Sequence, residues 1–340
     1  MRKVAKILAL LALMVCSACQ HKDLCYHHSD HAHKYHINIL ADYRFDWEEC
    51  YGGPDWKNMW PSHYMDYDLL RPTKPEGIRV VNHNEDGLSD KHNISADGGT
   101  VTLFEGYNDI LFYNNDTEYI MFSNTDHVAT TRATTRTMNR STYVGSEYAN
   151  KNEETMTPPD MLFANYYEDF YVEKLENPVD VKVTLQPLVY TYKVRYEFEE
   201  GLKYVAIARG ALSGMARSVL LYNGNTSEEA ATILYDCEIT DYGVRATVNS
   251  FGAPGYPHGN YPTRGEAENR HSLNLEVLMR NGSMITFDFD VTDQVQAQPH
   301  GGVIVVSGIK VKETDGTQGS GGFDVDVNDW GPYEDIDLPL

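Results

Sequence analysis

The sequence predicts an all-β protein made of two tandem antiparallel β-sandwich domains behind a lipoprotein signal peptide. Three observations support this fold class: short segments in which apolar and polar residues alternate, clusters of Gly, Asn and Asp between them, and the lack of sustained helical periodicity. Without its leader, the chain keeps roughly 320 residues, enough for about two domains that each bury a core. We place the domains at residues 35–177 and 178–340.

The first eighteen residues have the pattern of a signal peptide that ends in a lipobox. The apolar run Ile7–Val15 is far shorter than the ~20 residues needed to cross a bilayer. Two small residues then precede Cys19, whose thiol we expect to accept diacylglycerol before cleavage. The sequence therefore predicts a leader at residues 1–18 and a lipidated, His-rich tether at residues 19–34. The basic residues of the leader are Arg2, Lys3 and Lys6.

The mature protein is expected to be strongly acidic. The chain has 28 basic and 50 acidic residues, and the leader removes three cations and no acids, so 25 − 50 gives a net charge of −25. Such a surface repels nucleic acid and anionic lipid headgroups, and favours cations, cationic partners or simply solubility. We therefore expect no nucleic-acid partner, and contact with the membrane only through the lipid on Cys19.

The first sandwich opens with the longest alternating pattern, from Tyr35 to Trp47, which predicts a half-buried strand. Residues 124–160 are polar, and we expect a long insert there. The aromatic-rich segment Met161–Tyr171 is expected to pack back on this domain. Further strands are predicted at Gly77–His83, Thr100–Phe104, Asp109–Asn114 and Glu118–Ser123.

The second sandwich contains a hairpin whose register can be predicted. A two-residue Asn281-Gly282 turn would mix apolar and polar residues on each face. A three-residue loop, Arg280-Asn281-Gly282, with Gly282 left-handed, instead pairs Val277 with Ile285 and Leu275 with Phe287. We predict the three-residue loop. The strands expected in this domain are Val181–Glu199, Leu202–Ala208, Ser218–Tyr222, Thr232–Thr240, Val244–Ser250, Leu273–Met279, Ile285–Val291, Val303–Val311 and Phe323–Val327.

Four tracts carry a resemblance to a known group: His21–Tyr26, Thr157–Leu162, Gly210–Ala216 and the closing Val325-x-Val327-x-x-Trp330 pattern. In this order they resemble Bacteroidales surface lipoproteins related to the fimbrillin-associated anchor family. The resemblance implies two transthyretin-like (fimbrillin-like) domains at the outer membrane and a role in anchoring, nucleating or capping a fimbria. It also implies donor-strand exchange, in which a partner adds an extended segment to an open sheet edge.

The tether contains candidate metal ligands. Neutral imidazoles three or four residues apart can share one zinc, copper or nickel ion. The alternative is a hydrophilic spacer, which we favour because no fixed acidic or thiolate partner accompanies the histidines. If a metal binds, the candidate ligands are His27, His28, His31 and His33.

A group of aromatic residues follows the first predicted strand, beside Gly52-Gly53-Pro54. Exposed on a loop, they would stack on sugar rings or on a partner protein, whereas buried they would form a lid on the core. We favour the lid, because tryptophan is highly buried on average. Trp56 and Trp60 are the candidates for glycan or partner contact; Trp47 and Tyr51 complete the group.

Three cysteines follow the lipidated one. An oxidising compartment permits one bridge, with Cys25 and Cys50 the closest pair in sequence, and whether it forms stays open. Cys237 lies in an apolar stretch, and we interpret it as a small buried hydrophobic residue.

Enzyme and metal signatures are missing from the sequence. The tract Asp324-x-Asp326-x-Asn328 lacks the glycine and glutamate of an EF-hand, so we interpret its acids, like Asp288 and Asp290, as the outer face of an edge strand. No Gly-x-Ser-x-Gly, His-Glu-x-x-His or phosphate-loop motif occurs. Ser213 lies among small residues that we expect to form a tight chain reversal. We therefore predict no enzymatic activity, and no cofactor beyond the covalent lipid.

Taken as a whole, the sequence predicts a non-enzymatic outer-membrane lipoprotein on the cell surface. We expect it to act in fimbrial anchoring, fimbrial assembly or adhesion, and to bind a β-rich protein partner, such as a fimbrial subunit, by strand addition. The alternative is a glycan-binding surface lipoprotein that uses exposed aromatic residues.

Overall fold

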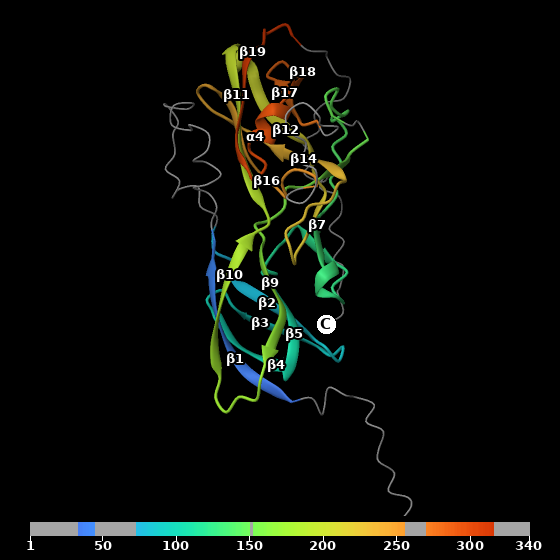
Figure 1. The fold of residues 1–340 in the computed structure, drawn as a ribbon. Coiled ribbons are helices and arrows are strands. Elements are labelled where there is room, and N and C mark those ends of the chain that lie inside the picture. The colour runs from blue at the N-terminus through green and yellow to red at the C-terminus, as the bar shows by residue number, and fades with distance from the viewer. Residues whose placement is uncertain (1–32, 45–72, 150–151, 256–269, 316–340) are drawn as a thin grey trace, which may run out of the picture.

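The computed structural model describes residues 33–44, 73–149, 152–255 and 270–315, and these residues form an all-β protein, as predicted. The strands are arranged as a closed barrel and three further sheets. In Figure 1 the barrel, which includes the blue and cyan strands, lies below the sheets built from the yellow-to-red part of the chain. No helix in the described part of the chain is long and apolar enough to cross a membrane.

The barrel has seven strands in the order β1-β10-β9-β5-β2-β3-β4. Two of its seams are narrow, because β9 and β10 share only two residue pairs and β3 and β4 only one. Alternate residues such as Ile37, Ile39 and Val183 point inward and are buried, which follows from the period of two along a strand. The strands are β1 Lys34–Tyr43, β2 Gly77–Asn84, β3 Ser89–Ser95, β4 Gly98–Phe104, β5 Gly106–Tyr113, β9 Phe163–Val172 and β10 Val179–Pro187.

The other sheets have the orders β18-β17-β12-β14-β8, β15-β16-β11-β19 and β13-β7-β6. The first two pack face to face over a core that includes Tyr192, Tyr196 and Leu275. Three short helices complete the described structure: η3 Val128–Thr130, η4 Leu202–Tyr204 and α4 Thr292–Ala297. The strands are β6 Ile120–Ser123, β7 Arg132–Thr135, β8 Glu154–Met156, β11 Tyr190–Glu200, β12 Val205–Ala216, β13 Ser218–Leu220, β14 Ala230–Asp236, β15 Glu238–Ile239, β16 Gly243–Ser250, β17 Ser272–Met279, β18 Met284–Asp290 and β19 Gly302–Lys310.

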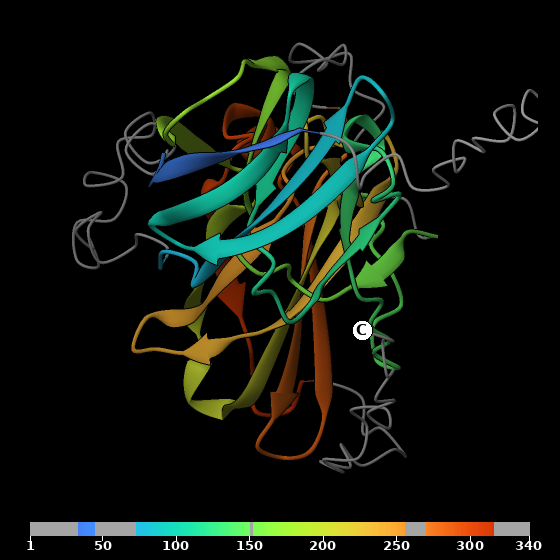
Figure 2. The same ribbon diagram turned by 90° about the horizontal axis from the view of Figure 1, so that it is seen from below.

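A third apolar core joins the barrel to the other sheets. It combines Leu111 and Ala164 of the barrel with Ala133 of β7, Val219 of β13 and Phe251. The three-stranded sheet contributes to this junction, since β6 and β7 come from the first half of the chain and β13 from the second. Figure 2, seen from below, shows the barrel strands crossing in front of the sheets behind them.

The predicted hairpin register is confirmed. The backbone N–H of Met279 donates to the carbonyl of Ser283 at 2.8 Å, and Gly282 is left-handed with φ 84°. Val277 pairs with Ile285 and Leu275 with Phe287, which places the apolar residues of β17 and β18 on one face.

Several strands differ from the prediction. The expected strand Val181–Glu199 is two strands, β10 and β11, and β10 pairs in parallel with β1 of the barrel although it lies beyond residue 178. The polar insert holds the short strands β7 and β8. β3 was missed because its sequence, SDKHNIS, has a single large apolar residue.

The tract Gly210–Ala216 is not a chain reversal, contrary to the prediction. It lies inside β12, which carries a bulge between Leu212 and Met215. Gly214 occupies the bulge with φ 82°, and a Cβ atom there would lie 2.2 Å from the carbonyl oxygen of Arg270. The small residues of this tract therefore permit close packing within a strand.

Candidate functional site: an open sheet edge

Most of the predicted site residues lie outside the described residues. His33 is described and is exposed. No group of three or more His, Cys, Asp or Glu side chains in the described ranges is arranged to hold a metal ion. The residues that lie outside are Cys19, Cys25, Cys50, His27, His28, His31, Trp56 and Trp60.

The two remaining candidates, Cys237 and Ser213, are packed within the sheets. Cys237 is a free thiol, packed against the core between the two larger sheets, and burial raises its pKa well above the usual range. Ser213 is 1% exposed, and its hydroxyl bonds with those of Tyr143 and Thr232, both at 3.0 Å. Neither residue has the surroundings of a reactive nucleophile.

Since the sequence predicts strand addition, the sheet edges are the places to examine. The barrel strands form a closed ring, although the seam between β9 and β10 is paired over only two residue pairs and the seam between β3 and β4 over one. In the four-stranded sheet, β15 is only two residues long. A docking strand needs a longer row of unpaired backbone groups, and the other end strands of the two larger sheets are β8, β19 and β18.

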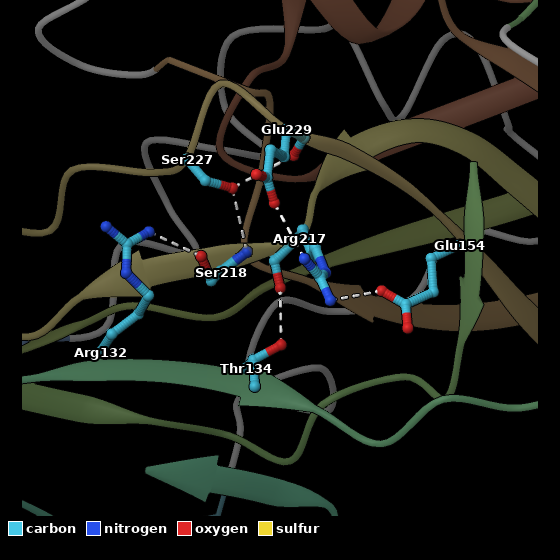
Figure 3. Close-up of polar contacts among 7 residues, drawn as sticks. All are labelled: Arg132, Thr134, Glu154, Arg217, Ser218, Ser227 and Glu229. Atoms are coloured by element: carbon cyan, nitrogen blue, oxygen red, sulfur yellow. Dashed lines mark hydrogen bonds and ion pairs between the residues drawn. The ribbon is translucent and has the colours of Figure 1, made fainter. Parts of the chain in front are cut away.

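The edge at β8 is covered by the chain itself. Residues 136–138 run alongside it: Met138 N–H donates to Thr155 O at 2.8 Å, and Thr157 N–H donates to Arg136 O at 2.9 Å. Arg217 forms an ion pair at the start of β8, where its guanidinium lies 2.6 Å from the carboxylate of Glu154 (Figure 3).

The start of β8 is also linked by polar contacts to the three-stranded sheet, as Figure 3 shows. Arg217 also contacts Glu229 at 2.9 Å, and its carbonyl accepts the hydroxyl of Thr134 at 3.0 Å. Arg132 donates to the hydroxyl of Ser218 at 2.8 Å. These surface contacts are individually weak, and it is the backbone pairing of residues 136–138 that leaves β8 no unpaired row for a partner strand.

The first part of the β19 edge is closed by two glutamine side chains from α4 and its C-cap. The amide of Gln294 accepts the N–H of Val305 and donates to its carbonyl, both at 2.9 Å. Gln298 does the same for Val303, at 2.7 and 2.9 Å. The spacing fits, because four helical residues rise about 6 Å and two strand residues rise about 6.6 Å. The two amides thus take the place of a neighbouring strand along Val303–Val305.

The edge at β18 is open. Because Met279 and Ser283 form a hydrogen-bonded pair, odd-numbered residues of β18 bond to β17, and even-numbered residues direct their N–H and C=O outward. Among the described residues, none donates to or accepts from the outward backbone groups of Met284, Thr286 or Asp288. This is a seven-residue strand with an unpaired row on its outer side.

The side chains of β18 form two different rows. Ile285, Phe287 and Phe289 face the core between the larger sheets but are only partly buried, and the two Phe rings stack with centroids 6.3 Å apart. Asp288 and Asp290 lie on the opposite face, as the sequence predicted for an edge strand. An added strand would therefore meet an apolar row on one side and carboxylates on the other.

The Asp288 carboxylate is held in a fixed position. It accepts the hydroxyl of Ser146 at 2.8 Å and the backbone N–H of Glu147 at 2.7 Å. Burial raises the pKa of Asp288, and these hydrogen bonds oppose the shift. Asp290 is exposed and accepts the N–H of Thr292 at 3.0 Å. Neither acid was identified as part of a site from sequence, although the Ile-Thr-Phe-Asp-Phe-Asp alternation marks both rows.

Comparisons with known proteins agree with a surface protein of this fold. The family model described as Domain of unknown function (DUF5119) matches residues 64–236. The chain is 23% identical over 305 residues to the Putative fimbrium anchoring subunit Fim4B of Bacteroides ovatus, covering 81% of this chain and 88% of that protein. This likeness confirms the resemblance to Bacteroidales fimbrial anchor proteins.

A solved structure shows the same fold. The crystal structure of a putative adhesin from Bacteroides ovatus superposes with a TM-score of 0.59 at 19% identity, covering 88% of this chain and 98% of that one.

Proposed function

Because this chain belongs to the DUF5119 family, and because a fimbrium anchoring subunit is among its relatives, we propose that it anchors or assembles a fimbria at the cell surface. In this proposal it is a non-enzymatic protein that accepts a β-strand from a protein partner along β18. The observation that supports it most is the row of unpaired backbone N–H and C=O groups along β18, beside a row of partly exposed apolar side chains.

We also propose the architecture and location implied by the sequence. The barrel and the pair of larger sheets would be two transthyretin-like domains, and the lipid on Cys19 would hold them at the outer membrane. A tether of sixteen residues, 19–34, spans roughly 50 Å when extended. Since β1 and β18 lie at opposite ends of the molecule (Figure 1), the open edge would then face away from the membrane.

A proline substitution tests the proposal at the backbone. Thr286→Pro removes one outward N–H of β18 and leaves the hydrogen bonds to β17, which use odd-numbered residues. Thr286→Val is the matched control, because it keeps the N–H. Binding of a fimbrial subunit from the source bacterium should weaken at least about tenfold in the proline variant alone, since that variant loses a hydrogen bond and clashes with the incoming strand.

Two results decide this test. The proline variant must keep the midpoint of urea unfolding of the control, so that lost binding reports on the edge. Equal binding by both folded variants would remove strand addition at β18 from the proposal.

One observation favours the alternative, a glycan-binding protein. Tyr107 and Tyr171 are cross-strand neighbours on the barrel, 48% and 59% exposed, with ring centroids 5.0 Å apart. Exposed aromatic faces stack on sugar rings. In a glycan-binding assay, Tyr171→Ala would abolish binding if this alternative holds, and Thr286→Pro would leave it unchanged.

A further inference from the structure

We propose that the β18 edge selects a partner segment in which apolar residues alternate with lysine or arginine. This inference rests on the proposed function and adds the chemistry of the partner strand. It follows from the two different rows of side chains on β18, each of which would contact one face of an incoming strand.

The inner row requires apolar residues in the partner. Ile285, Phe287 and Phe289 pack against the core on one side, and no described strand continues the sheet beyond them. A strand that pairs with the outward groups of β18 would place every second side chain beside this row. Those side chains would complete the burial of the row, which favours apolar residues at alternate positions.

The outer row requires basic residues in the partner. β18 carries the carboxylates of Asp288 and Asp290 on this face and contains no basic residue. Asp288 is already held by Ser146 and Glu147, so its side chain loses little further conformational entropy when it pairs with a cation. Opposite charges directly across two strands attract, and like charges repel, so the other alternate positions favour lysine or arginine.

The same two acids would reject the acidic segments of this chain. The sequence Phe323-Asp324-Val325-Asp326-Val327, which lies outside the described residues, has the required alternation but carries acids at the polar positions. Beside Asp288 and Asp290 those acids would repel. The net charge of −22 likewise opposes pairing of the edge with a second copy of the chain. Specificity would thus come from repulsion of wrong strands as well as attraction of the right one.

Three peptides test this inference on the full chain by fluorescence anisotropy. They share the apolar residues of Phe-x-Val-x-Val and carry Lys, Thr or Asp at both x positions. The Lys peptide should bind about 2-fold to 25-fold more tightly than the Thr peptide, since each of two charge pairs contributes a factor of roughly 1.5 to 5. The Asp peptide should bind more weakly than the Thr peptide. The advantage of Lys over Thr should shrink in high salt.

A charge-removing variant locates the effect. Asp290→Asn should reduce the advantage of the Lys peptide over the Thr peptide by a factor of roughly 1.5 to 5. Asp86→Asn, the same change at an exposed turn of the barrel, should leave that advantage unchanged. If Asp86→Asn had the larger effect, long-range attraction to the acidic protein, and not β18, would explain the preference.

The outcomes separate this inference from the proposed function. Equal binding of the Lys and Thr peptides, lost in Thr286→Pro, would overturn the charge rule while strand addition at β18 stands. Failure of all three peptides to bind would overturn both. A preference for Lys that is reduced in Asp290→Asn, together with weaker binding of the peptides by Thr286→Pro, would support both.

Discussion

The side-chain amide of Gln294 pairs with both backbone groups of Val305, accepting its N–H and donating to its carbonyl at 2.9 Å. An edge strand normally exposes such groups to any extended chain. Gln298 repeats the pattern at Val303, so the β19 edge is closed from within the molecule along Val303–Val305. The β18 edge has no such cover among the described residues, and it is the edge where we expect strand addition.

Opening the β19 edge should therefore both destabilise the protein and promote self-association. Gln294→Met removes both hydrogen bonds to Val305 at constant side-chain length, which should lower the free energy of unfolding by about 1–3 kcal/mol. Urea unfolding measures the loss, and light scattering measures the association. Gln186→Met is the control, because among the described residues that amide donates a single hydrogen bond, to the carbonyl of Thr184 in the barrel. Equal effects of the two substitutions would contradict an edge-closing role for Gln294.

The segment that crosses the outer face of the five-stranded sheet carries a buried ion pair. Arg140 lies 2.9 Å from Glu276, with side chains 7% and 3% exposed. Arg140→Met should lower the free energy of unfolding by about 3–5 kcal/mol, because it leaves a buried carboxylate without a cation. The double variant Arg140→Met, Glu276→Met should recover most of that loss. Urea unfolding of the three variants measures it, and a double variant as unstable as the sum of the singles would contradict the pairing.

His271 should make stability fall in mild acid. It is 1% exposed, and burial lowers its pKa from 6.5 to about 4, although Asp290 opposes the shift. The unfolded chain binds a proton below pH 6.5 that the folded chain refuses until about pH 4, so stability is complete above pH 6.5 and declines below it. The decline should reach about 2 kcal/mol at pH 5.

Two variants isolate this effect. His271→Gln should show a smaller loss of unfolding free energy between pH 7.5 and pH 5 than the unmodified chain. His36→Gln, at an exposed position on β1, should show the same loss as the unmodified chain. An unchanged pH dependence in His271→Gln would assign the acid sensitivity to other groups.

Gly214 should resist any side chain. In Gly214→Ala the new Cβ would lie 2.2 Å from a backbone carbonyl at φ 82°, so the free energy of unfolding should fall by roughly 2–4 kcal/mol. Gly87→Ala is matched in conformation, with φ 78°, but has open space around it, so it should cost about 1 kcal/mol. Similar losses at both positions would show that conformation alone, and not the close approach, requires glycine at Gly214.

Local patterns could be predicted from sequence, whereas long-range neighbours could not. The β17–β18 register followed from Gly282 and from the need to keep Leu275 and Phe287 on one face. The pairing of β10 with β1 could not be predicted, because apolar and polar residues alternate in both β10 and β11 and this alternation does not indicate which sheet each strand joins. The acids of β18 were expected on an outer face. Its open edge could not be predicted, because it depends on whether another strand pairs with the outer side of β18.

The most direct test of strand addition is the exchange of individual β18 amides measured by NMR. In the free protein, the N–H groups of Thr286 and Asp288 should exchange quickly, while those of Ile285 and Phe287, bonded to β17, exchange slowly. Binding of the fimbrial subunit, or of the Lys peptide, should slow Thr286 and Asp288 specifically. Protection that appears elsewhere while Thr286 and Asp288 stay unprotected would contradict the account.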